Sequence, residues 1–79
     1  MNSAQTPRIT GNLRAEMARR GITQQQVAEI LGLSRAAVSR RLLGQSPISI
    51  DELFVITEHF GIDMASIIFA GTDNSQQVA

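Results

Sequence analysis

Four places in the sequence carry the combined signals that begin an α-helix, and they constrain the fold more than any other feature. Each has a residue whose side-chain oxygen can accept a hydrogen bond from the free N–H groups of a first helical turn. One apolar residue precedes it and another lies four positions after it, which is the spacing of a hydrophobic staple. The four predicted N-cap residues are Thr23, Ser34, Ser49 and Asp63.

Glycines mark where the predicted helices end. Each stands directly after a segment whose apolar residues recur every three or four positions, as on one face of a helix. These glycines are Gly21, Gly32, Gly44 and Gly61. Starts and stops together predict five helices, over about residues 10–20, 23–31, 34–43, 49–60 and 63–69. Because no segment alternates apolar and polar residues with a period of two, the fold class is all-α.

The length and composition agree with one small domain. With 79 residues and no cysteine, the chain has neither disulfides nor thiolate metal sites. We expect a compact five-helix bundle over residues 9–70. The polar ends, residues 1–8 and 71–79, are expected to be a flexible arm and a flexible tail.

Charge is divided unevenly along a chain whose net charge is zero. The chain has no lysine, and its seven arginines lie between Arg8 and Arg41, a span with two acidic residues. Five acidic residues and no arginine follow it. The first part therefore carries a net charge of +5 and the second −5. Such a division favours an anionic partner for the basic part.

The second and third predicted helices are joined by only Gly32 and Leu33. So short a connection makes a sharp corner, as in a helix-turn-helix, whose second helix enters the major groove of DNA. The chain here resembles the phage Cro and cI repressors and their XRE-like bacterial relatives, in the stretch TQQQVAEILGLSRAAVSRRLLG. The matching features are Gln24, the Val27–Ala28 pair, Gly32, Ser34 and apolar residues at positions 33 and 38. The resemblance covers about residues 9–69 and implies a lambda-repressor-like DNA-binding domain.

The third predicted helix has an outward arc, opposite its core-facing Val38 and Leu42, at about 100° per residue. An arginine fork matches O6 and N7 of guanine, a serine hydroxyl donates or accepts, and an alanine methyl packs on the thymine methyl. The base-reading positions of the family map onto the same arc. We therefore expect base contacts from Arg35, Ala36, Ser39 and Arg40. The alternative is that the two arginines are solvated or contact phosphates.

Further polar residues around the corner are candidates for phosphate contacts. They are Gln24, Gln25, Ser34 and Ser46. In relatives, the glutamine that matches Gln24 contacts a phosphate, and a helix N-terminus has the free N–H groups for it; a solvated first turn is the alternative. Ser34 is foremost an N-cap.

The other arginines have different predicted roles. Arg41 lies off the outward arc and is expected to pair with Asp51 or Glu52, with a phosphate contact as the lesser possibility. Three arginines of the first helix are interpreted as a solvated face that attracts DNA at long range, namely Arg14, Arg19 and Arg20. Arg8 belongs to the predicted arm, which is either disordered or reaches around the duplex.

The fourth and fifth helices hold more apolar residues than one small core needs. The excess consists of Phe54, Val55, Met64, Ile68 and Phe69. Excess apolar surface often marks an interface, so we expect a homodimer on palindromic half-sites about 10 bp apart. The alternative is that these residues close the core of a monomer.

Nothing in the pattern indicates catalysis. His59 is the single histidine, and no metal-binding spacing or glycine-rich phosphate loop is present. No apolar run approaches the ~20 residues of a membrane span, and no secretory signal begins the chain. We expect a cytoplasmic, nucleoid-associated transcriptional regulator that binds double-stranded DNA sequence-specifically, without cofactor or small-molecule substrate. The alternative is a protein-docking module on the same fold, such as an antitoxin or an antirepressor-like partner.

Overall fold

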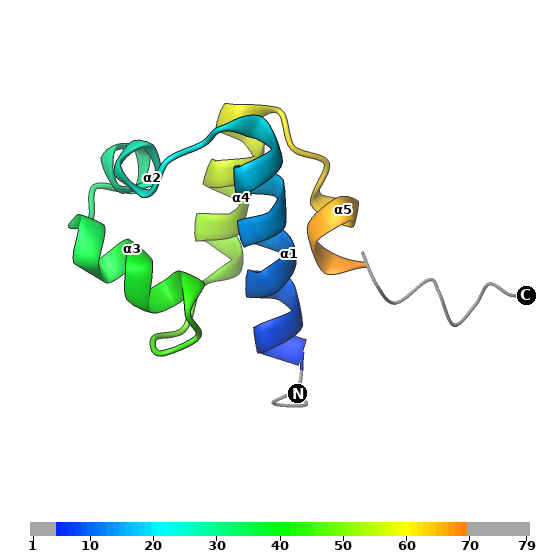
Figure 1. Ribbon diagram of the computed structural model, residues 1–79, viewed down its shortest axis with the longest axis horizontal. Helices are drawn as coiled ribbons and strands as arrows, with labels where there is room; N and C mark the ends of the chain where they lie inside the picture. Colours follow the sequence, from blue (N-terminus) through cyan, green and yellow to red (C-terminus); the bar gives the residue numbers. More distant parts are fainter. Residues whose placement is uncertain (1–4, 70–79) are drawn as a thin grey trace, which may run out of the picture.

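Five helices and no strand make up residues 5–69, the part of the chain that the computed structural model describes. They are α1 (Gln5–Arg20), α2 (Gln24–Leu31), α3 (Arg35–Leu42), α4 (Ile50–Phe60) and α5 (Met64–Ile68). Figure 1 shows α2 and α3 on one side of α1 and α5 on the other. Packing follows this order, because α1 contacts both α3 and α5, while α2 contacts α3 and α4. The predicted all-α, five-helix architecture is confirmed.

The core lies where the inner faces of all five helices converge. Leu13, Ile56 and Ile67 are fully buried, and burying a side chain of this kind stabilises the fold by roughly 1.5–3 kcal/mol. The remaining buried apolar residues are Met17, Val27, Ala28, Val38, Leu42, Leu53 and Ile62. No helix among residues 5–69 is long and apolar enough to cross a membrane.

The four predicted N-caps are present. Each accepts a hydrogen bond from a backbone N–H of its helix's first turn, and two of them complete a capping box with a side chain three residues on. The donor to Thr23 Oγ1 is the Gln26 N–H, at 3.1 Å. The other three caps are Ser34, Ser49 and Asp63. Local sequence therefore sets where α2 to α5 begin.

Three of the corners between helices are built in the same way. At the α2–α3 corner, Gly32 has a left-handed φ of 68°, which suits glycine because it has no Cβ. The next residue, Leu33, donates its N–H to the Ala28 carbonyl at 3.0 Å, a bond that closes the end of a helix. Leu33 also packs against the core and directly precedes the Ser34 cap. The corresponding residues at the other two corners are Ile22 and Ile62.

The predicted start of the first helix, near Thr10, is wrong, because α1 begins at Gln5. Pro7 falls in the first turn, where backbone N–H groups have no helical partner, so a residue that lacks an N–H removes no hydrogen bond there. Residues 5–8 of the predicted arm are therefore helical. Residues 1–4 and the predicted tail, 71–79, lie outside the described residues.

Candidate nucleic-acid interface

Helix α3 is anchored by one face and exposes the other. Val38 and Leu42 are almost fully buried, at 1% and 2% exposure. On the opposite arc, three of the four predicted base-reading residues are exposed and Ser39 is half-buried. The exposed three are Arg35, Ala36 and Arg40. The ridge that they form is thus held rigidly by the core and left open to a partner.

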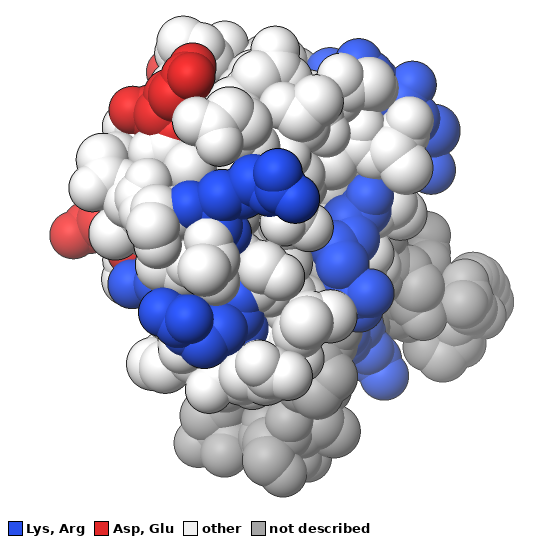
Figure 2. All heavy atoms as spheres, turned by 60° about the vertical axis from the view of Figure 1, so that its left-hand side comes forward, with Lys and Arg blue, Asp and Glu red and all other residues white. Residues whose placement is uncertain are grey.

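The two arginines of this ridge have no acidic partner within residues 5–69. Figure 2 shows the face that brings α2 and α3 forward, with arginine side chains spread across it and acidic side chains only towards its left-hand margin. Because Arg35 and Arg40 are exposed and unpaired, their five N–H donors each are available to an anionic or acceptor-rich ligand.

A shallow groove connects the start of α2 with the ridge on α3. It is lined by Thr23, Gln24, Gln25 and Arg35. Thr23 satisfies only the N–H of Gln26, so the first two N–H groups of α2 point out of the helix end without a helical partner. Together with the arginine they give the groove a positive potential. This arrangement suits a phosphate bound at Gln24 and Gln25, the two residues of α2 that are predicted to contact phosphates.

The two predicted serine contacts have different surroundings. Ser34 Oγ accepts the Ala37 N–H at 3.0 Å, as an N-cap. Ser46 is half-buried in the connection after α3, and its N–H donates to the Arg40 carbonyl at 3.2 Å. The Ser46 backbone N–H is therefore already used within the fold, which leaves its hydroxyl for a ligand.

Arg41 forms the predicted ion pair with an acid at the start of the fourth helix, and Glu52 is the partner. Arg41 Nε lies 3.1 Å from Glu52 Oε1 and 3.2 Å from Oε2, with both side chains less than a quarter exposed. Arg41 Nη1 also donates to the Ala37 carbonyl. Glu52 at the same time accepts the Ser49 N–H at 3.0 Å. Arg41 therefore connects α3 to the capped start of α4 and points away from the ridge.

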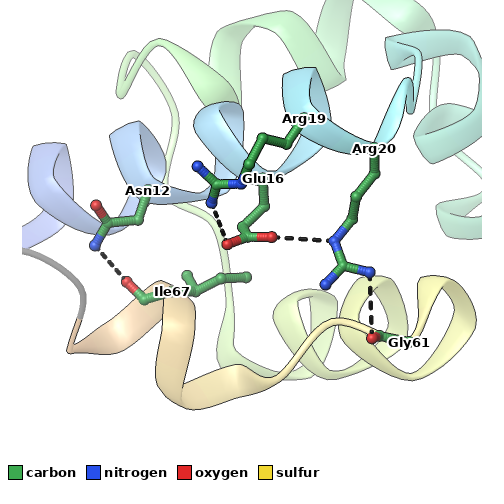
Figure 3. Close-up of polar contacts among 6 residues, drawn as sticks. All are labelled: Asn12, Glu16, Arg19, Arg20, Gly61 and Ile67. Atoms are coloured by element: carbon green, nitrogen blue, oxygen red, sulfur yellow. Dashed lines mark hydrogen bonds and ion pairs between the residues drawn. The ribbon is translucent and has the colours of Figure 1, made fainter.

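Arg19 and Arg20 are solvated, as predicted, with side chains 65% and 41% exposed, but their charges are not free. Both pair with Glu16, whose side chain is only 11% exposed, and Figure 3 shows the two guanidinium groups converging on its carboxylate. Hydrogen bonds from Arg20 and Arg19 hold the pKa of Glu16 below its usual range, although burial acts in the opposite direction. Arg20 Nη1 also reaches the Gly61 carbonyl, at 3.4 Å. Arg20 therefore connects α1 to the α4–α5 corner, whereas the ion pair of Arg19 stays within α1.

The outer face of α4 is apolar and open. Phe54 and Val55 are 52% and 42% exposed and line a groove with Glu58 and His59. Of the other predicted interface residues, Phe69 is exposed whereas Met64 and Ile68 are half-buried. Ile50 was not among the predicted interface residues, yet it is also exposed. Its position four residues, or one turn, before Phe54 was the signal that could have identified it. The core of the monomer leaves this face of α4 uncovered.

In the helix-turn-helix class of DNA-binding proteins, a sharp corner is followed by a helix that enters the major groove. The glycine corner described here, and the following helix with one buried side and arginines on the other, have this arrangement. Residues 13–67 match the family model described as "Helix-turn-helix". The chain belongs to this XRE-like helix-turn-helix family and has the lambda-repressor-like fold. Comparisons with curated proteins and with solved structures found no match. No group of three metal-ligating side chains gathers within the described residues.

Proposed function

We propose that this DNA-binding domain is a sequence-specific transcriptional regulator of the Cro and repressor kind, from a phage or a bacterium. The observation that carries the proposal is the α3 ridge, where Arg35 and Arg40 are exposed and unpaired while Val38 and Leu42 fix the helix from behind. In this class of proteins, a helix so placed lies in the major groove. The protein then works at the bacterial nucleoid or phage genome that holds its operator.

Each residue of the ridge has a distinct role in this proposal. Arg35 and Arg40 read guanines through paired hydrogen bonds to O6 and N7. Ser39 adds a hydroxyl contact, and Ala36 packs on a thymine methyl. Phosphate contacts that set the register come from Gln24, Gln25, Ser34 and Ser46.

The proposed working form is a homodimer on a palindromic operator. The exposed Phe54 and Val55 support it, because apolar side chains of this size are left in water by the monomer. Met64, Ile68 and Phe69 extend the proposed interface onto α5. Two copies related by a twofold axis would present their α3 ridges to half-sites about one helical turn apart.

Two measurements test the proposal together. Selection of bound sequences from a random duplex pool should yield a palindromic motif with guanines at fixed positions. Arg40→Ala should then weaken binding to that motif by roughly 1–3 kcal/mol and relax the preference at one base pair of each half-site. Its stability should not change, since Arg40 is exposed and unpaired in the described part of the chain.

The alternative function predicts a different result. A protein-docking module, such as an antitoxin or an antirepressor-like partner, would enrich no motif and bind duplexes weakly at every salt concentration. A DNA-binding regulator should instead lose affinity steeply as salt rises, because neutralised phosphates release their counterions. Absence of both a motif and a salt dependence would overturn the proposed function.

A further inference from the structure

One large apolar side chain is exposed away from the proposed dimer interface. Within residues 8–69, four of the exposed large apolar residues belong to that interface or to the α4 face that carries it, namely Ile50, Phe54, Val55 and Phe69. The remaining one is Leu43, which directly follows α3, is 57% exposed and is not part of the core. Neither the core nor the proposed dimer accounts for this side chain.

The backbone continues the helical geometry of α3 through Leu43, so its direction can be compared with that of the ridge. Its N–H donates to the Ser39 carbonyl at 3.0 Å, as in an α-helix, and its φ and ψ are −88° and −2°. At about 100° per residue, Leu43 lies about 40° from Ser39 and about 60° from Arg40 around the axis, on the arc between them. Leu43 therefore extends the α3 ridge with a large apolar side chain.

The backbone on both sides of Leu43 is held by hydrogen bonds. Directly after it, the Gly44 N–H donates to the Arg41 carbonyl at 3.1 Å, and the Gln45 N–H donates to the Arg40 carbonyl at 2.8 Å. The left-handed φ of Gly44, 78°, turns the chain away from α3 at this point. Because its backbone is already ordered, Leu43 would lose only side-chain freedom on binding a ligand.

The place of Leu43 along α3 puts it over bases that Ala36 and Arg40 do not reach. At 1.5 Å per residue, it lies about 4.5 Å beyond Arg40 and about 10.5 Å beyond Ala36, whereas base pairs follow each other every ~3.4 Å of duplex. A leucine side chain has no donor or acceptor. The feature that it can recognise in the major groove is the methyl group of thymine.

We propose that Leu43 is a further specificity residue, which packs on the methyl group of a thymine one or two base pairs beyond the guanine that Arg40 reads. This inference rests on the proposed function, because it needs a duplex seated on the α3 ridge. The exposure of Leu43 and its direction between Ser39 and Arg40 are the observations that carry it. The thymine proposed for Ala36 is a different one, at most about three base-pair steps away.

The test replaces the thymines of the selected operator by uracil, one position at a time, which removes only the methyl group. For the wild type, one thymine in each half-site should show a loss of affinity of about fourfold, the factor expected for burying one methyl group. Leu43→Ala should bind thymine and uracil equally at this position. Leu43→Met, which keeps an apolar side chain of similar volume, should retain the preference for thymine.

Ala36 provides the control within the same operator, because the thymine that it contacts should stay sensitive to uracil in Leu43→Ala. This comparison of two duplexes within one variant does not depend on the stability of that variant. Thermal unfolding of Leu43→Ala should nevertheless match the wild type, since Leu43 is exposed.

Two outcomes would overturn the inference and leave the proposed function standing, provided that Arg40→Ala still loses specificity. In the first, Leu43→Ala binds as tightly as the wild type. In the second, it loses affinity but keeps the wild-type response to uracil at every thymine, which means packing on the sugar–phosphate backbone. A wild type that selects no motif from a random pool overturns the proposed function itself.

Discussion

At the scale of single residues, Glu16 is the most buried charged residue within residues 5–69, and its two arginine partners keep it ionised. Its pKa is lowered in the folded protein, so the folded state binds a proton less readily than the unfolded state. Glu16 therefore stabilises the fold at pH values above the usual range of a carboxyl group. This contribution is lost as the pH falls through the lowered pKa.

We expect the difference in Tm between the wild type and Glu16→Gln to depend on pH. The variant should have a lower Tm at about pH 6, and the difference should shrink as the pH is lowered to about 3. Thermal unfolding followed by circular dichroism measures it. Glu29→Gln, which changes an exposed glutamate of α2, is the matched control and should follow the wild type. A constant difference across the pH range would contradict the role of the ion pairs.

The Glu16 cluster also shows what residue-level prediction missed. Glu16 lies three positions before Arg19 and four before Arg20, which are the spacings at which side chains meet on a helix. The signal was therefore present. The arginines were interpreted as one solvated group, and this interpretation left the spacing to Glu16 out. A sum of charges does not show which of them are neutralised by neighbours.

At the scale of helices, the position of α3 depends on its connection to α4 through Arg41 and Glu52. Arg41→Ala should lower the stability by about 1–2 kcal/mol, between the values typical of exposed and of buried ion pairs. For a domain of this size, that corresponds to a decrease in Tm of roughly 5–10 °C. DNA affinity should change less, because Arg41 points away from the ridge.

Arg40→Ala is the control on the neighbouring residue. It should lower DNA affinity and leave the Tm unchanged, the reverse of Arg41→Ala. Thermal unfolding and a binding titration on both variants check the pair. Loss of affinity without loss of stability in Arg41→Ala would instead support the phosphate contact, which was the lesser of the two predicted roles.

The helices were predictable to the extent that their signals are local. Caps, staples and glycines act within a few residues, so the starts of α2 to α5 follow from the sequence. The start of α1 was not predicted in this way, and Thr10, the expected first residue, is 2% exposed inside the helix. Contacts with the rest of the fold bury it there, and short-range signals do not report such contacts.

At the scale of the whole molecule, the outer face of α4 is the proposed interface between two copies. Phe54→Asp should convert a dimer into a monomer, since a charge would be buried in the apolar groove. It should weaken binding to a palindromic operator by at least about tenfold while leaving binding to a single half-site unchanged. Analytical ultracentrifugation and titrations with the two duplexes measure these effects.

Leu43→Asp is the control for this experiment. Leu43 is as exposed as Phe54 but does not line the α4 groove, so the variant should remain a dimer. A monomeric wild type at about 100 µM would contradict the homodimer. Phe54 and Val55, which the sequence marks as more than one core needs, are exposed, whereas Met64 and Ile68 of the same set are half-buried. Only packing in three dimensions decides how far each of these residues is covered.

At three corners, one apolar residue serves both the helix before it and the helix after it, and this restricts how the chain can vary in length. At each one, a single apolar residue closes the preceding helix with its backbone N–H, packs its side chain against the core and directly precedes the next N-cap. An inserted residue would separate these roles. The connection between α3 and α4, residues 43–49, is built differently. Natural or engineered insertions should therefore be tolerated there and rejected at the other three joins.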